Sequence, residues 1–394
     1  MPINFQEIYT RIQEIGKGAR ERQKTLDARR AKARDLLITY ASELDLLRSK
    51  VNSARAVDAN IRCACPLQES LTSSHPAPAA TSGIVLIAAD GSQITPDRHA
   101  ALQFGLINIG AISMKLNSGE TPEIFTESEL FYGDDLLPND VPLSDDMLAL
   151  KRDLAERIKL DDLSRSFPGR VITLTDGPIE LWGAKGEDAR AYADFIQKYL
   201  TILSRLQSRG VITAGYVDKP AADLVVRLLE ITTADQEQIQ NLREFHPLRG
   251  VSDRWLFGEP GHPLLPPGHR SAVFKLQSSS DKNYKGLLEL HFFYLNVGTQ
   301  GHPWSVRVEI PRWVADDDAS LNSLHSVLVD QCRVMGSKPY PYLLHRAHET
   351  ALVQMEEKQQ IEQLLALELR RNNGDLDDGS YKQSAKDLPG RTRM

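Results

Sequence analysis

The stretch IVLIAADGS at residues 84–92 decides the fold, because it joins a buried strand to a carboxylate at the strand's end. Its first six residues are apolar, and Asp90 follows them in front of a glycine and a serine. A continuous apolar run bounded by turn residues is typical of a strand covered on both faces. The pattern returns in RVITLTDGP at residues 170–178, where a second apolar strand ends at Asp176. The sequence therefore predicts two buried strands that each deliver an aspartate to a loop.

Two more strands and a helix lie between these aspartates. Strand-like segments cover residues 100–116 and 122–132, with the turn signal NSG between them. Ser144 is the expected N-cap of a helix that carries Glu156. Three strands, a helix and a fourth strand that packs against the first are the order of the ribonuclease H-like fold. We expect an α/β fold, with a ribonuclease H-like mixed sheet flanked by helices.

The acids Asp90, Glu156 and Asp176 are candidate catalytic metal ligands, because that fold places the aspartates side by side and leans the helix across them. Phosphodiester hydrolysis needs an activated water and charge stabilisation, which divalent cations supply. Mg²⁺ and Mn²⁺ prefer carboxylate oxygen. Each acid also has an ordinary interpretation, as a turn aspartate or a solvated helix glutamate. Glu127 and Glu129, near the end of a strand, compete for the third position.

The segment YPYLLHRAHETAL at residues 340–352 adds histidines. A helix bearing His345, His348 and Glu349 would offer a late metal ligand or a proton-transfer group, since imidazole suits both roles. A hydrogen-bonded structural histidine explains the same spacing equally well.

The chain divides into four segments by composition. Few prolines and a helical spacing of apolar residues predict an N-terminal helical arm, for which dimerisation is favoured over docking to DNA or protein. A Pro/Ser/Thr/Ala-rich stretch without regular structure predicts a linker. Strands and helices then alternate, and a single helix from Tyr340 to about Arg371 closes the core before a polar, disordered tail. The segments are residues 1–62 for the arm, 63–83 for the linker, 84–371 for the core and 372–394 for the tail.

The net charge of −6 indicates that any DNA contact is local, because phosphate neutralisation needs basic groups. Residues 1–60 hold 12 Lys and Arg against 8 Asp and Glu. The sequence has no apolar run of membrane-spanning length and no signal-peptide pattern, so we expect a cytoplasmic protein. Cys63, Cys65 and Cys332 are too few and too badly spaced for a disulfide framework or a zinc site, and they are expected to be reduced surface thiols.

The motifs together resemble the NurA family of DNA-repair nucleases, over about residues 84–355. The resemblance is carried by the order and spacing of several short motifs. They are ADGSQ at Asp90, Arg152-x-x-x-Glu156, TDGPIELW at Asp176, RVEIPRW around Glu309, and GSKPYPYLLHRAHETAL with His348.

The resemblance implies a Mn²⁺- or Mg²⁺-dependent deoxyribonuclease that acts on single-stranded DNA and DNA ends. It implies 5′–3′ exonuclease and single-strand endonuclease activity in double-strand break repair, beside a HerA-type hexameric ATPase, and a homodimer. Asp90, Glu156 and Asp176 resemble the family's metal ligands, and His348 its catalytic histidine. The family's active-site tyrosine has no clear anchor here, and Tyr294 is the provisional choice.

Other assignments rest on single features. Lys219, Arg254 and Arg270 are weak candidates for DNA contacts, since surface or loop cations are often merely solvated. A haloacid dehalogenase-like phosphatase is set aside because the segment after Asp90 lacks that class's second aspartate. The alternative function is a non-catalytic, DNA-binding scaffold subunit of a translocase complex.

Overall fold

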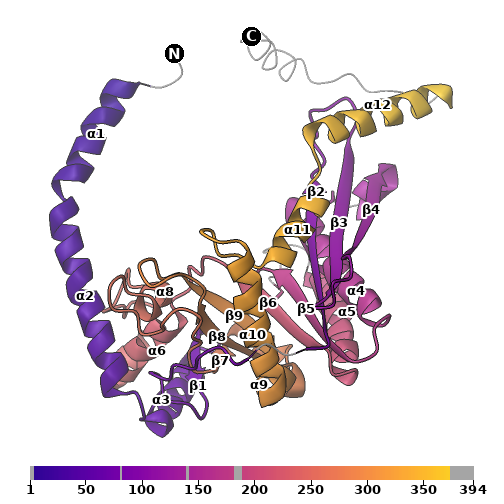
Figure 1. Ribbon diagram of the computed structural model, residues 1–394. Helices are drawn as coiled ribbons and strands as arrows, with labels where there is room; N and C mark the ends of the chain where they lie inside the picture. Colours follow the sequence, from indigo (N-terminus) through magenta and orange to yellow (C-terminus); the bar gives the residue numbers. More distant parts are fainter. Residues whose placement is uncertain (1–3, 80–81, 139–141, 182–188, 373–394) are drawn as a thin grey trace. The chain divides into compact units, whose positions relative to one another are not determined.

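The computed structural model describes residues 4–79, 82–138, 142–181 and 189–372, and the chain forms two compact units (Figure 1). The first unit joins Met1–Ala79 to Tyr216–Val329, and the second joins Ala80–Gly215 to Asp330–Met394. This division differs from the expected single core over 84–371, because the arm and the segment after it pack with the later half of the chain. The expected tail, 372–394, lies outside the described residues except for its first position.

The second unit contains the predicted ribonuclease H-like sheet. Strands β2, β3 and β4 form an antiparallel meander, and β5 pairs in parallel with β2. The strand order in this unit is β6-β5-β2-β3-β4, and the strands of the first unit follow the order β1-β7-β8-β9. The predicted α/β fold class is confirmed. The bounds are β2 Ile84–Ile94, β3 Phe104–Lys115, β4 Glu123–Tyr132, β5 Arg170–Asp176 and β6 Ile212–Val217.

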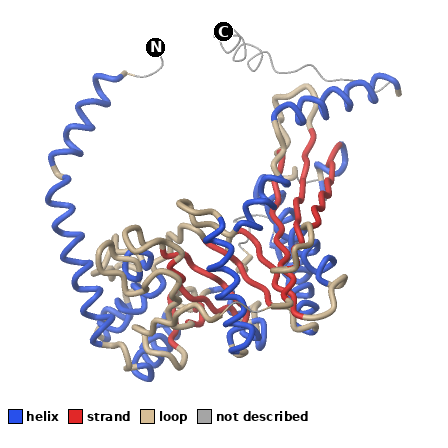
Figure 2. Tube along the Cα trace, viewed as in Figure 1, coloured by secondary structure: helices blue, strands red, loops and turns tan. Residues whose placement is uncertain are grey.

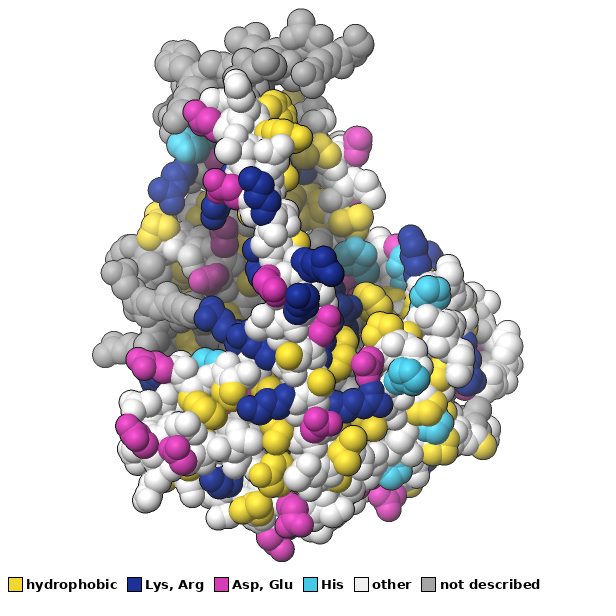
Figure 3. Space-filling model, turned by 90° about the vertical axis from the view of Figure 1, so that its left-hand side faces the viewer, with side chains coloured by type: hydrophobic (Ala, Val, Ile, Leu, Met, Phe, Trp, Pro, Cys, Tyr) yellow, Lys and Arg dark blue, Asp and Glu magenta, His cyan; other side chains and the backbone are white. Residues whose placement is uncertain are grey.

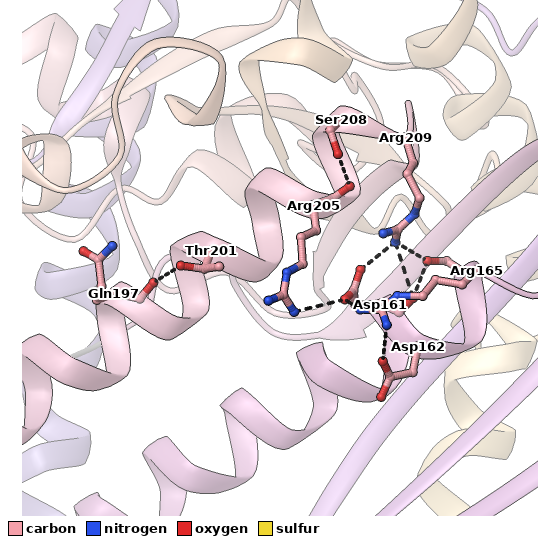
Figure 4. A network of polar contacts seen from close by, with 9 residues as sticks. Asp161, Asp162, Arg165, Gln197, Thr201, Arg205, Ser208 and Arg209 are labelled. Carbon is pink, nitrogen blue, oxygen red and sulfur yellow. Dashed lines mark hydrogen bonds and ion pairs between the residues drawn. The ribbon is translucent and has the colours of Figure 1, made fainter.

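Helix α4, Asp145–Ser164, begins where the sequence predicts, because Ser144 Oγ accepts the backbone N–H of Met147. At its end the buried Asp161 pairs with Arg165 and with Arg209, whose Nη2 donates to Asp161 Oδ1 over 2.5 Å (Figure 4). This network joins the ends of α4 and α5. Besides α4, the unit contains η1 Gly133–Leu136, α5 Ala189–Ser208, α11 Tyr342–Ala351 and α12 Met355–Arg371.

The single helix expected from Tyr340 to about Arg371 is two helices, α11 and α12. Side chains of the sheet bind the carbonyl of Ala351, at the end of α11. Gln354 then starts α12 with a capping box, in which its backbone N–H donates to Glu357 over 2.7 Å. Contacts with the sheet and a new N-cap therefore interrupt a pattern that reads as one helix.

The first unit begins with the predicted helical arm, α1 and α2, which follow one another as long helices (Figure 2). The expected linker starts with a strand, because β1 pairs with β7 in an antiparallel ladder. The elements are α1 Phe5–Lys17, α2 Ala19–Thr39, α3 Leu44–Val57, β1 Cys63–Pro66, α6 Leu224–Thr233, α7 Gln236–Gln240, α8 Asp253–Phe257, β7 Phe274–Gln277, η3 Ser279–Lys282, η4 Gly286–Leu288, β8 Leu290–Asn296, β9 Ser305–Pro311, α9 Arg312–Ala315 and α10 Asp318–Val334, which runs on past the unit's last residue.

The expectation that the three cysteines lie at the surface is wrong. Cys63 and Cys332 are buried and Cys65 is half-buried, so they are not surface thiols, although none of these three forms a disulfide. Burial raises the pKa of Cys63 far above its usual value, which keeps it a neutral thiol.

In the view of Figure 3, Lys and Arg side chains are interspersed with Asp, Glu and hydrophobic side chains. In the described part of the chain, every helix is too short or too polar to cross a membrane.

Candidate active site

Asp90 and Asp176 lie at equivalent positions of neighbouring parallel strands. Asp176 ends β5, whereas β2 continues past Asp90 to Ile94, so the loop predicted after Asp90 is strand, paired with β3. In the register of β2 and β5, Ala89 lies opposite Thr175, and each aspartate is the next residue of its strand. Equivalent positions of parallel strands point to the same face, so the two carboxyl groups share one edge and one face of the sheet. The register therefore places the two aspartates at corresponding positions of adjacent strands.

Glu156 reaches this edge from α4. It is 6% exposed, and a Cβ atom on Gly91 would lie 2.8 Å from its Oε1. The same Cβ would lie 2.6 Å from Arg152 Cγ. The absence of a side chain at Gly91 therefore lets α4 lie close to β2 and brings Glu156 beside the residue that follows Asp90.

His348 reaches Asp90 from α11. Its Nδ1 lies 2.7 Å from Asp90 Oδ2, while Asp90 Oδ1 accepts the backbone N–H of Gly91 over 2.9 Å. The histidine side chain is 58% exposed. Both oxygens of Asp90 are thus hydrogen-bonded, and the imidazole has one ring nitrogen left for solvent or substrate.

The sheet holds α11 through a close approach at Gly110, which lies opposite Asp90 in the β2–β3 register. A Cβ atom on Gly110 would lie 2.4 Å from the backbone nitrogen of Ala351. Ser92 Oγ and Asn108 Nδ2 donate to the Ala351 carbonyl over 2.5 and 2.8 Å. These contacts fix the end of α11 and thereby the position of His348.

The acids influence one another's ionisation. The pKa of Glu156 is raised well above its usual value, first by burial and then by the charges of Asp153 and Asp90. The pKa of Asp176 is also raised, first by loss of hydration and then by Asp90, although part of its surface reaches solvent. A hydrogen bond from Tyr340 to Asp176 opposes that shift. The site is therefore rich in negative charge that its protein neighbours only partly offset.

The donor chemistry of the three acids fits a hard divalent cation, because such a cation would relieve their mutual repulsion. In the described part of the chain, however, no three His, Cys, Asp or Glu side chains form a ready metal cage. Glu156 Oε1 instead lies 3.5 Å from Arg152 Nε. Arg152 is thus the present charge partner of Glu156.

The competing third acids lie apart from this arrangement. Glu127 is exposed and pairs with Lys159 over 3.0 Å, and Glu129 is exposed on the same strand. Glu309, in the first unit, is fully buried and pairs with Arg307 over 2.9 Å.

The provisional tyrosine also lies elsewhere. Tyr294 belongs to the first unit, is fully buried, and donates its hydroxyl to Asp253 over 2.6 Å. The tyrosine that contacts a site carboxylate is Tyr340, on Asp176. Sequence reasoning missed it, although it stands in the PYPYLL segment, because no spacing rule pairs residue 340 with residue 176.

The candidate DNA contacts have different surroundings. Arg270 is 6% exposed and pairs with Glu69 over 3.3 Å, so its charge is engaged within the fold. Arg254 lies over the ring of Trp304, 4.9 Å from its centroid. Lys219 is exposed. Only Lys219 and Arg254 remain open to a DNA strand.

Comparison with known proteins identifies the family. The sequence matches the NurA domain over residues 84–353, more than half of the chain. Curated protein sequences give no match. The crystal structure of the NurA nuclease from Sulfolobus solfataricus is similar over 93% of this chain and 98% of its own, with 12% identity and a TM-score of 0.48. Endonuclease V of Ciona intestinalis in complex with DNA is similar over 80% of this chain and 96% of its own, with 11% identity and a TM-score of 0.30. On the strength of the domain match, this chain belongs to the NurA family.

Proposed function

We propose that this chain is a metal-dependent deoxyribonuclease that hydrolyses phosphodiester bonds of single-stranded DNA and DNA ends. The observation that carries the proposal is the parallel register that sets Asp90 beside Asp176. The buried Glu156 and the Asp90-bound His348 complete the group. Neighbouring carboxylates repel one another and so destabilise the fold unless a bound ligand neutralises their charge. A cluster of carboxylates with a histidine is therefore better explained by hydrolysis of a phosphodiester than by a structural role.

Asp90, Glu156 and Asp176 would hold Mn²⁺ or Mg²⁺, with Glu156 leaving Arg152 to do so. A bound cation of this kind lowers the pKa of water and stabilises charge on phosphate oxygens. The protein's own groups supply position and protons. Asp90 accepts the Nδ1 proton of His348, which leaves Nε2 free to exchange a proton with water or with the leaving oxygen.

Family membership also supports a proposal for the biological setting. We propose that the nuclease acts in double-strand break end resection with a HerA-type hexameric ATPase, as a homodimer in the cytoplasm, with 5′–3′ exonuclease and single-strand endonuclease activity. Co-elution of this chain with such an ATPase at low salt tests the partnership, and separate elution of the two proteins contradicts it.

The test of activity uses labelled single-stranded DNA with Mn²⁺ or Mg²⁺. The wild-type chain should degrade the DNA, and EDTA should stop it. Asp90→Ala should be inactive, while Glu127→Ala, which removes an exposed acid away from the site, should keep full activity. If the wild-type chain binds DNA but does not cleave it with either metal, the proposal fails and the scaffold function is favoured.

A further inference from the structure

Arg157 occupies an unusual position, next to Glu156 on α4. It is 2% exposed, and its Nη2 donates to Thr175 Oγ1 over 2.9 Å. Its guanidinium lies over the ring of Tyr199, with Cζ 5.4 Å from the centroid. The side chain is therefore held in place by β5 and α5.

The guanidinium also acts electrostatically on the Tyr199 hydroxyl, but two of its three nitrogens form no regular hydrogen bond within the described residues. Nε and Nη1 of Arg157 are buried and have no hydrogen-bond partner among the described residues. Across the same residues, no ion pair joins Arg157 to a carboxylate, although its charge acts on the carboxyl of Glu156. Buried arginine donors are nearly always hydrogen-bonded, and leaving them unsatisfied costs stability. The unsatisfied donors of Arg157 therefore indicate a ligand that is not part of the chain.

A cavity lies where such a ligand would bind. It has a volume of about 220 Å³ and lies between α4, the end of β5 and α5, all in the second unit. Arg157 lines it together with the proposed metal ligands Glu156 and Asp176. At about 30 Å³ per water molecule, a cavity of this size takes a phosphate group and part of its sugar.

We propose that Arg157 forms a phosphate-binding subsite for the DNA strand beside the reactive bond, an inference that rests on the proposed nuclease function. The planar guanidinium, fixed by Thr175 and Tyr199, offers two free donors to phosphate oxygens. The acids that line the same cavity would repel a phosphate by themselves, so the subsite fills when a cation is bound to them. The phosphate is either a strand terminus or an internal phosphodiester.

The experiment compares Arg157→Met and Arg157→Lys with Arg205→Met, a matched change of an exposed arginine in the same unit. Steady-state kinetics are measured with linear single-stranded DNA carrying a 5′ phosphate, the same DNA with a 5′ hydroxyl, and circular single-stranded DNA. Arg157→Met should raise KM at least tenfold while kcat changes little, because a charge-assisted contact to bound substrate is lost. The KM of Arg157→Lys should lie between those of the wild type and Arg157→Met. The KM and kcat of Arg205→Met should equal the wild-type values.

The three substrates identify the source of the phosphate. If Arg157 binds a terminal phosphate, the wild type favours the 5′-phosphorylated strand and Arg157→Met loses that preference. If it binds an internal phosphodiester, KM rises equally for linear and circular DNA. Both outcomes support the subsite.

An unchanged KM in a folded Arg157→Met protein, or a fall in kcat alone, would overturn the subsite and leave Arg157 a structural neighbour of Glu156. Circular dichroism and thermal unfolding establish folding, and Arg157→Lys carries the same test if the methionine variant does not fold. An inactive wild type defeats the proposed function itself, whereas an active wild type with unaltered Arg157 variants defeats only this inference.

Discussion

At the scale of single residues, the buried carboxyl of Glu156 lowers the stability of the fold and is also a proposed metal ligand. Its carboxyl is buried, and burial together with Asp153 and Asp90 raises its pKa above the value of about 4.3 found in unfolded chains. The folded chain therefore holds this proton more tightly than the unfolded chain does. Stability falls as pH rises from the unfolded pKa through the raised one, and the full penalty is present above both.

Glu156→Gln should remove this penalty. Without divalent metal, the melting temperature at pH 8 should rise by a few degrees, since a poorly compensated buried charge costs about 1–3 kcal/mol. The gain should be smaller at pH 5, because the raised pKa keeps more of wild-type Glu156 protonated there than at pH 8. Thermal unfolding in EDTA at both pH values measures the effect, and nuclease activity should be lost. A lower melting temperature at pH 8 would contradict this account of Glu156.

His348→Ala should lower kcat by about 10²–10⁴-fold with little change in folding, because the side chain is largely exposed and its single contact with a site residue is the bond to Asp90. His345→Ala is the control on the same helix, since His345 faces Glu349 at 3.5 Å. Single-turnover cleavage measures both variants. Equal activity of the two would exclude a catalytic role for His348.

At the scale of elements, the site depends on how closely α11 lies against β3. The carbonyl of Ala347 would lie 2.6 Å from a Cβ atom on Gly110, so even one methyl group must push the helix away. Because Gly110 is opposite Asp90 in the sheet, a shift of α11 there acts directly on the bond between His348 and Asp90.

Gly110→Ala should therefore reduce kcat at least tenfold and destabilise the second unit by about 1–3 kcal/mol. Gly105→Ala is the control on the same strand. A Cβ atom at position 105 would have Pro96 Cγ as its nearest neighbour, at 3.4 Å, which is an ordinary van der Waals contact. Kinetics and thermal unfolding compare the two. If Gly110→Ala cleaves DNA at the wild-type rate, close packing of α11 does not position His348.

The elements also show how far local patterns reach. The strand β5 and the Ser144 cap of α4 are encoded in short stretches, and the sequence predicts both nearly to the residue. The start of β2 is predicted in the same way, but its end is not, because pairing with β3 extends the strand from Asp90 to Ile94. The break between α11 and α12 was not, because Ser92 and Asn108 that bind the end of α11 are more than 200 residues away in sequence.

At the scale of the whole molecule, the arm presents apolar residues that the chain itself leaves uncovered. Within α1, Ile8 is 44% and Ile12 is 56% exposed, and they recur at helical spacing. Such a stripe is the expected surface of a homodimer.

Ile8→Glu with Ile12→Glu should convert a dimer to a monomer, because paired charges would face one another across the stripe. Gln6→Glu with Gln13→Glu adds the same charge at other exposed positions of α1 and should leave the dimer intact. Light scattering coupled to size-exclusion chromatography measures the mass. A dimer that survives the isoleucine changes removes α1 from the interface.

The sequence by itself determined the order of strands and helices from β2 to β5 and the carboxylates that they carry, because apolar periodicity and capping are local properties of a chain. Only the tertiary structure decided that His348 contacts Asp90, that Tyr340 rather than Tyr294 contacts a site acid, and that the arm packs with the later half of the chain. These outcomes depend on which distant surfaces pack together, and side-chain packing between remote segments leaves no periodic trace in the sequence.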